Sequence, residues 1–267
     1  MANKSTSEVP ARGSLSGSST GTPRSGDSCG SAIPSTFVLV HGAWHGGWCW
    51  RGVADILRTP GHVVHAPSLT GLADRSHLLS PSIRLHDHVA DIVNLVKWED
   101  LHDIVLVGHS YGGMVVSGVA QELASRIKAV VYLDAFLPQD GQSLKDQLGE
   151  QAWLQMQEQV TGDKRAYLPP PQAKALMVGE KNQAWVDSQC TAHPVATFED
   201  VLESVAGLDR VQRKVYVLAG AFGSPPFVGI AGRCKQSGWE VIDLPFGHDL
   251  MVDAPQQVAE ILLRAAT

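Results

Sequence analysis

The sequence predicts an α/β protein built on a doubly wound, mostly parallel β-sheet. Short runs of β-branched and aliphatic residues alternate along the chain with helical patterns, and most of those runs are continuously apolar. Strands buried on both faces of a parallel sheet have this composition, whereas strands with one solvated face alternate between apolar and polar residues. The chain has 267 residues, 44% of them apolar, which suits a globular domain.

Six segments are expected to be strands, with helices between them. The strand segments are Thr36–His41, His62–Ala66, Asp103–Gly108, Ala129–Asp134, Lys214–Ala219 and Trp239–Leu244. The helical segments are Gly52–Arg58, His86–Lys97, Tyr111–Ala124 and Ala254–Ala265. Asp253 is expected to cap the last helix, because it precedes Pro255, and proline is favoured in the first turn of a helix. This alternation of strand and helix is typical of doubly wound sheets.

Two stretches depart from the alternation. Residues 137–213 separate the fourth strand from the fifth by 77 residues, more than a crossover helix needs, and include a helical run at Phe198–Leu208. We expect this insertion to form a lid over the carboxyl ends of the strands, where open α/β sheets bind ligands.

In residues 1–35, Ser, Gly, Thr and Pro make up 21 of 35 positions, which predicts a disordered tail before a single domain at 36–267.

Composition excludes several functional classes. Acidic residues outnumber basic ones by 27 to 21, giving a net charge of -6, so the basic face of a nucleic-acid-binding protein is missing. No apolar run approaches the roughly 18 residues of a membrane-spanning helix. Cys29, Cys49, Cys190 and Cys234 have no metal-binding spacing. We therefore expect a cytoplasmic protein without metal or other cofactor, whose partner is a small molecule; the oligomeric state is left open.

The motif with the clearest chemical meaning is Gly108-His109-Ser110-Tyr111-Gly112-Gly113, which directly follows the third strand. A G-x-S-x-G sequence between a strand and a helix is typical of a nucleophile elbow, in which the serine has a strained backbone and side chains at the flanking glycines would collide. Ser110 is therefore the candidate nucleophile. The alternative is a Ser-Gly turn that only packs the helix against the sheet.

A serine nucleophile needs a base and an oxyanion hole. His248 follows the last strand and precedes the last helix, which is the place of the base in the chain order Ser, acid, His. One oxyanion donor is expected to be the backbone N–H of Tyr111, the residue after the nucleophile. The other is expected from the glycine-containing loop after the first strand, where Ala43 is the candidate.

Three segments carry a family resemblance: FVLVHGAWHGGWCW at 37–50, GHSYGG at 108–113 and GHDLMVDAP at 247–255. They resemble the α/β-hydrolase superfamily, in particular the plant methylesterase and hydroxynitrile lyase group, and most of all bacterial pyrethroid-hydrolase-like carboxylesterases. The resemblance implies the α/β-hydrolase fold, with a helical lid between the strands equivalent to the family's sixth and seventh. The candidate residues predict a serine carboxylesterase acting through an acyl-enzyme, and the apolar lid residues, Trp44 and the low overall charge favour neutral, apolar esters. Pyrethroid-type esters are candidates by the resemblance alone.

The resemblance leaves the triad acid open. The plant enzymes take it from the loop after the strand equivalent to Lys214–Ala219, but here that loop, residues 220–227, contains no carboxylate. Asp134, at the end of the neighbouring strand, is the favoured replacement because that strand end also faces the histidine loop. The alternative is that Asp134 only caps the first turn of the lid, and Asp140 or a lid carboxylate such as Asp200 are further candidates for the acid.

Trp44 and His109 are expected to contribute to substrate binding beside the catalytic residues. A hydroxynitrile lyase is one alternative. Members of that group, however, have His-Thr where this chain has His41-Gly42, and they have a lysine after the catalytic histidine, where this chain has Asp249. The other alternative is a non-catalytic receptor on the same fold, which commonly lacks a triad member.

Overall fold

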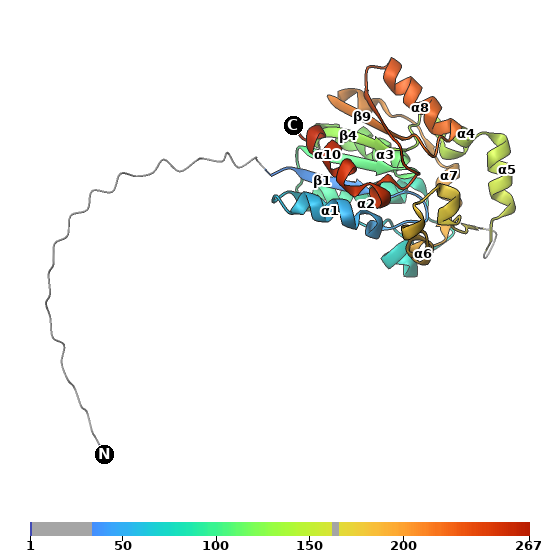
Figure 1. Cartoon of the computed structure of the whole chain (residues 1–267), viewed down its shortest axis with the longest axis horizontal. Coiled ribbons are helices and arrows are strands. Elements are labelled where there is room, and N and C mark those ends of the chain that lie inside the picture. The colour runs from blue at the N-terminus through green and yellow to red at the C-terminus, as the bar shows by residue number, and fades with distance from the viewer. Residues whose placement is uncertain (2–33, 162–165) are drawn as a thin grey trace. The chain divides into compact units, whose positions relative to one another are not determined.

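The protein is described by a computed structural model that covers residues 1, 34–161 and 166–267 (Figure 1). Apart from Met1, Pro34 and Ser35, the predicted tail at 1–35 lies outside the described residues. The domain from Pro34 to Thr267 contains a six-stranded sheet in the order β10-β9-β4-β3-β1-β2, with every neighbouring pair parallel. Its strands are β1 (Thr36–Val40), β2 (Val63–His65), β3 (Ile104–His109), β4 (Ile127–Leu133), β9 (Arg213–Ala219) and β10 (Glu240–Leu244). The predicted α/β fold is therefore confirmed.

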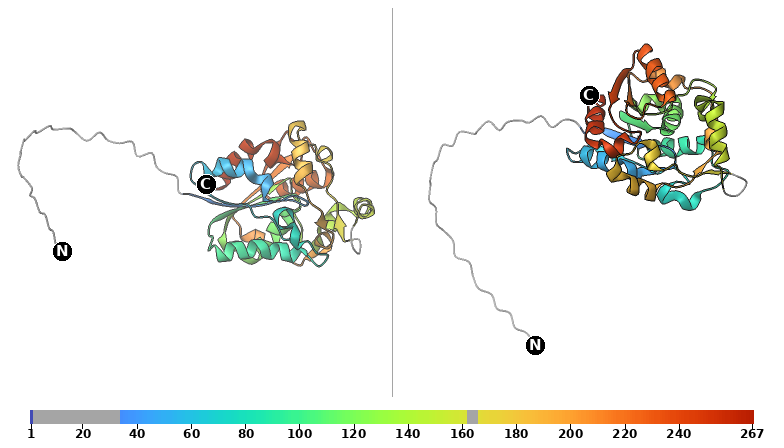
Figure 2. Two further views of the ribbon diagram at one scale, coloured as in Figure 1. Left: turned by 90° about the horizontal axis from the view of Figure 1, so that it is seen from below. Right: turned by 45° about the vertical axis from the view of Figure 1, so that its right-hand side comes forward.

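Helices cover both faces of the sheet (Figure 2). Alternate strand residues face opposite sides, so that Phe37 and Leu39 pack into one hydrophobic cluster and Val38 and Val40 into the other. The first cluster is completed by α1 (Arg51–Arg58), α9 (Leu250–Asp253) and α10 (Pro255–Ala265), and the second by α2 (Leu85–Trp98), α3 (Gly112–Leu123) and α8 (Pro225–Gln236). Burial on both faces explains the continuously apolar strand sequences. Short 3₁₀ helices η1 (Gly47–Trp50), η2 (Ala73–Leu78) and η3 (Ala124–Arg126) lie in the connections.

The segment between β4 and β9 has mixed structure. It contains α4 (Leu144–Leu148), α5 (Glu150–Glu158), α6 (Glu180–Gln189), α7 (Ala196–Glu199), η5 (Ala173–Leu176) and η6 (Ala206–Arg210). It also contains two small antiparallel pairs, β5 (Gln142–Ser143) with β8 (Val201–Leu202) and β6 (Tyr167–Leu168) with β7 (His193–Pro194). Among the described residues, no helix combines the length and the apolar character needed to cross a membrane.

The predicted helical run at Phe198–Leu208 is wrong. Helix α7 ends at Glu199, and Asp200 has an extended backbone with φ −68° and ψ 140°. The Asp200 carboxylate accepts a hydrogen bond from the backbone N–H of Leu85 at 2.9 Å, which ties this residue to the start of α2 and lets the chain leave as strand β8. A contact between segments far apart in the sequence thus ends a helix that the local pattern would continue.

Two other helix starts differ from the sequence analysis. Helix α8 was not predicted, although Pro225 and Pro226 occupy its first turn, where proline is favoured. Asp253 does not cap α10, because it ends the separate helix α9 and the N-cap residue of α10 is Ala254. The Asp253 carboxylate instead accepts hydrogen bonds from the N–H of Gly179 and the amide of Asn182, both at 2.7 Å. Asp253 therefore ties the inserted segment to the C-terminal helices.

Candidate active site

Ser110 lies in a tight turn between β3 and α3. Its backbone has φ +52°, in the left-handed region that L-residues rarely adopt. The flanking glycines are required by close backbone approaches: a Cβ added to Gly112 would lie 2.7 Å from the carbonyl oxygen of His41, and one added to Gly113 would lie 2.0 Å from that of Phe136. The Ser110 carbonyl is held by the N–H groups of Gly113 and Phe136. This is the geometry of a nucleophile elbow.

His248 and Asp134 form a buried hydrogen-bonded pair. Nδ1 of His248 lies 2.6 Å from Oδ2 of Asp134, and the other carboxylate oxygen accepts the N–H of Ala219 at 3.0 Å. Asp134 is fully buried and has φ +43°, and its own N–H donates to the carbonyl of Val217 at 2.7 Å. Because a carboxylate only accepts, the His248 Nδ1–H is the donor, which leaves Nε2 as the nitrogen for proton exchange.

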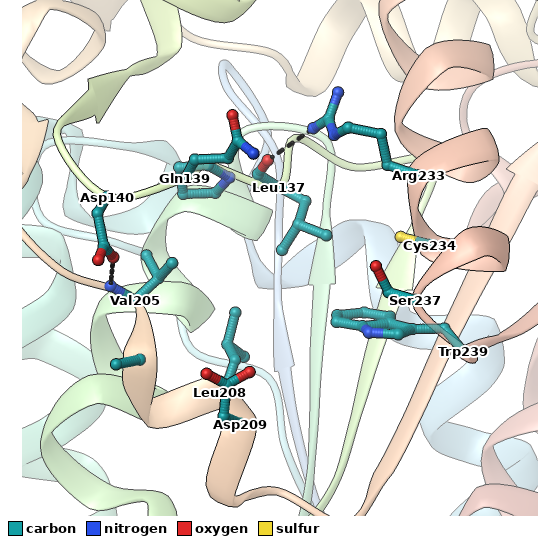
Figure 3. Close-up of a pocket in the computed structure, with 12 residues that line it drawn as sticks. Leu137, Gln139, Asp140, Val205, Leu208, Asp209, Arg233, Cys234, Ser237 and Trp239 are labelled. Atoms are coloured by element: carbon teal, nitrogen blue, oxygen red, sulfur yellow. Dashed lines mark hydrogen bonds between the residues drawn. The ribbon is translucent and has the colours of Figure 1, made fainter.

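The other two candidate acids are engaged elsewhere. Asp140 accepts the N–H of Val205 at 2.6 Å at the rim of a cavity of about 380 Å³ that lies between the insertion and α8 (Figure 3). Asp200 accepts the N–H of Leu85 and faces the guanidinium of Arg84 at 3.5 Å. The structure thus brings Asp134, rather than Asp140 or Asp200, to the histidine.

The ring of His248 is held by aromatic side chains that the sequence analysis did not single out. The rings of Phe227 and His248 stack with centroids 5.2 Å apart, and the ring of Phe222 lies 4.8 Å away. The backbone N–H of His248 donates to the carbonyl of Leu176 in the insertion at 2.9 Å. Both phenylalanines lie in residues 220–227, the segment that lacks a carboxylate. The presence of two aromatic residues in that segment is the only sequence signal for this contact.

The two predicted oxyanion donors belong to residues next to the nucleophile in sequence or to the loop that approaches it. Ala43 and Tyr111 are buried, and no group within the described part of the chain accepts a hydrogen bond from their backbone N–H. A Cβ added to Gly42 would lie 2.9 Å from Cβ of Ser110, so glycine allows the loop that carries Ala43 to approach the nucleophile. The two N–H groups therefore remain free to bind an oxyanion.

A model of the alpha/beta hydrolase family matches residues 37–261 of the chain. The chain belongs to the α/β hydrolase family. A carbendazim hydrolyzing esterase from Nocardioides sp. (strain SG-4G) is 40% identical over 237 residues, which cover 85% of this chain and 98% of that protein. Salicylic acid-binding protein 2 from Nicotiana tabacum is 35% identical over 103 residues, 38% of this chain and 40% of that protein.

A solved structure agrees with these sequence matches. An extracellular α/β-hydrolase from a Paenibacillus species, described as sharing structural and functional homology with tobacco salicylic acid binding protein 2, has a TM-score of 0.76 and 26% identity. It covers 87% of this chain, and the match covers 99% of that structure. The resemblance to the plant methylesterase group and to bacterial esterases is therefore confirmed, and this α/β hydrolase is esterase-like.

Trp44 contacts the insertion, whereas His109 contacts the histidine loop. Trp44 has φ +64°, and its indole N–H donates to the carbonyl of Leu168 in the insertion at 3.1 Å. His109 is fully buried, and its Nε2–H donates to the carbonyl of His248 at 3.1 Å. Burial lowers the pKa of His109 well below its ordinary value, so the ring is neutral. A role of either residue in binding substrate stays a prediction.

Two further buried histidines, His88 and His193, pack their rings against that of Tyr111, and His41 lies near them; none of the three was predicted to belong to the site. His88 donates through Nε2 to the carbonyl of Thr70 at 2.9 Å and therefore accepts the Tyr111 hydroxyl at Nδ1, 2.8 Å away. Burial lowers the pKa of His41 to about 3, and also lowers the pKa of His88 and His193. Among the described residues, no three His, Cys, Asp or Glu side chains are grouped to hold a metal ion.

Proposed function

We propose that this α/β hydrolase is a serine carboxylesterase with Ser110 as nucleophile, His248 as general base and Asp134 as the triad acid. The observation that carries the proposal is the 2.6 Å pair between His248 and Asp134, because Asp134 directly follows β4, the strand that pairs with the β3 strand of the Ser110 elbow. Four separate segments of the chain supply the nucleophile, base, acid and oxyanion donors, as acyl transfer requires.

The proposed reaction has two halves. Ser110 Oγ attacks the ester carbonyl while its proton passes to Nε2 of His248, and the resulting imidazolium is stabilised by Asp134. The negative charge on the carbonyl oxygen is met by the N–H groups of Ala43 and Tyr111, and one such donor is worth about 3 kcal/mol of barrier. His248 then protonates the departing alcohol, and water hydrolyses the acyl-enzyme by the same steps.

The surroundings of the site favour neutral, apolar esters. The side chains of Phe222 and Phe227 lie against His248, and those of Trp44, Phe198 and His193 form an aromatic cluster beside Tyr111. Burial keeps His193 neutral by lowering its pKa well below its ordinary value. Such a lining offers dispersion contacts and no counter-charge to an anionic substrate.

The proposal gives the insertion between β4 and β9 the role of a lid. Its backbone contacts both sides of the site, since Leu168 accepts the Trp44 indole N–H and Leu176 accepts the N–H of His248. Residues of the insertion therefore border the space in which substrate would lie. This arrangement supports the view that the insertion shapes the ester-binding pocket.

A fluorophosphonate probe tests the proposed function. It labels a serine that is activated by its histidine, so we expect labelling of the wild-type protein that is abolished in Ser110→Ala and strongly reduced in His248→Ala. Activity is then measured on p-nitrophenyl esters of increasing acyl length, on carbendazim, which the Nocardioides relative is named for, and on a pyrethroid ester. An unlabelled wild-type protein would favour a non-catalytic receptor, and a preference for charged acyl groups would contradict the neutral substrate class.

A further inference from the structure

A second histidine–aspartate pair lies beside the proposed catalytic pair, and the mechanism above does not use it. Nε2 of His45 is 2.9 Å from Oδ2 of Asp249, and the two side chains are 2% and 0% exposed. The ring of His45 stacks on that of Trp48 with centroids 5.2 Å apart. Burying an ion pair costs desolvation free energy unless further hydrogen bonds satisfy both groups. A pair buried beside the site therefore suggests a functional role.

The hydrogen bonds define the protonation state of His45. Its Nδ1 lies 2.8 Å from the carbonyl oxygen of Ala43, which can only accept, so Nδ1 carries a hydrogen. The contact between Nε2 and the carboxylate of Asp249 needs a second hydrogen, and imidazole is a stronger base than a carboxylate. His45 is therefore an imidazolium that donates from both nitrogens.

The electrostatics agree with this assignment. Burial opposes both charges, but the neighbouring Asp249 carboxylate raises the pKa of His45, and His45 in turn holds the pKa of Asp249 below its ordinary range. Five other titratable groups lie near the pair: His41, His109, His248 and the thiols of Cys49 and Cys190, which face Asp249. His41 and His109 are neutral because burial lowers the pKa of each. Burial raises the pKa of both thiols, so they remain uncharged.

The pair joins loops that the proposed mechanism needs in a fixed relation. Asp249 directly follows His248, and His45 is two residues after Ala43. Between Ala43 and His45 lies Trp44, whose φ of +64° is a strained conformation for a bulky residue and persists only where neighbours hold it. The bond from His45 to the Ala43 carbonyl spans this strained residue and fixes the peptide that follows the proposed oxyanion donor.

We propose that the His45–Asp249 pair is a positioning element that anchors the oxyanion loop to the histidine loop, with His45 acting as a doubly donating imidazolium rather than as a base. The inference rests on the proposed esterase function, because it assigns a purpose to the position of Ala43. His45 is unsuited to proton transfer with substrate because both of its nitrogens are engaged, whereas His248 uses only Nδ1 for its aspartate.

Two amide substitutions separate the two hydrogen bonds of His45. In His45→Asn the side-chain amide lies near the position of Nδ1 and can still donate to Ala43, whereas in His45→Gln it lies near Nε2 and keeps only the contact with Asp249. We expect kcat on a p-nitrophenyl ester to fall about 10- to 100-fold in His45→Gln, less than for a lost oxyanion donor because the Ala43 N–H is displaced rather than removed, with KM within about twofold. His45→Asn keeps the bond to Ala43 but loses the link to Asp249, so its kcat should fall by a similar factor, and equal kcat in wild type and either variant would overturn the proposal.

A second measurement uses the unmodified protein and does not depend on activity. Nitrogen-15 NMR of the histidine rings at pH 7.5 should show both nitrogens of His45 protonated, with the ring signals assigned in the wild-type protein through their bonds to the assigned backbone of residue 45. A neutral His45 would overturn the assignment even if neither variant folds. If the wild-type protein hydrolyses no ester and is not labelled at Ser110, the esterase proposal fails, whereas the NMR result still decides the state of the pair.

Discussion

The residues of the candidate site are held in backbone conformations that few side chains tolerate. Ser110, Asp134 and Trp44 all have positive φ, at +52°, +43° and +64°. Each such residue costs of order 1–3 kcal/mol and is maintained only by its surroundings. For Asp134 those surroundings are the N–H of Ala219 and the carbonyl of Val217, both on β9, which also turn the carboxylate towards His248. Strain at the strand ends is thus coupled to the direction in which the functional side chains point.

Asp134→Asn tests the assignment of the triad acid. The amide oxygen can still accept the N–H of Ala219, but an amide cannot stabilise the imidazolium or enforce the reactive tautomer of His248, so we expect kcat to fall by about 10⁴-fold. Thermal unfolding should show that the variant stays folded. The matched control is Asp140→Asn, whose carboxylate bonds to Val205 instead, and its kcat should stay near that of the wild type. Near-normal activity in Asp134→Asn would remove the assignment.

At the scale of elements, structure is predictable from the sequence where the signal is local or nearly so. The strands were recognisable because burial on both faces demands apolar runs, and the Ser110 elbow because its glycines face carbonyl oxygens that leave no room for a Cβ. The end of α7 was not predictable, because the bond from Asp200 to Leu85 crosses more than a hundred residues of sequence. The His45–Asp249 pair was not predictable for the same reason, since the partners are 204 residues apart in the sequence.

Gly247 marks the contact between the histidine loop and the insertion. A Cβ added there would lie 2.0 Å from the carbonyl oxygen of Met177, a backbone atom that can move only with the insertion. We expect Gly247→Ala to lower both the melting temperature and kcat, because the adjacent His248 would shift relative to Ser110. Gly229→Ala is the control: Gly229 lies within α8 with no atom within 4 Å of an added Cβ, so its replacement should leave kcat unchanged and stabilise by about 0.5–1 kcal/mol.

An unchanged melting temperature in Gly247→Ala would mean that the insertion yields without cost, and the contact would then not position His248. A loss of stability with full kcat would separate the two roles and limit Gly247 to folding. Measuring both quantities on both variants therefore distinguishes a packing constraint from one that acts on the site.

At the scale of the whole molecule, the large number of buried neutral histidines makes stability depend on pH. Burial lowers the pKa of His41 to about 3 and also lowers the pKa of His88, His109 and His193. Well above pH 6.5 these rings are neutral in both the folded and the unfolded chain, so they contribute no pH dependence there. As pH falls below 6.5 the unfolded chain binds protons that the folded chain does not bind, so the free energy of unfolding decreases.

We expect this loss to be steep between pH 6.5 and 5, with each buried neutral histidine contributing up to about 1.4 kcal/mol per pH unit. His45 does not offset it, because a histidine with a raised pKa contributes its full stabilisation already below pH 6.5. Urea unfolding at several pH values measures the slope of the free energy of unfolding against pH. His193→Asn should flatten it, whereas His86→Gln, which replaces a side chain that is 76% exposed, should leave it unchanged. A free energy of unfolding that stays constant from pH 7.5 to 5 would mean that these histidines can be protonated without opening the fold.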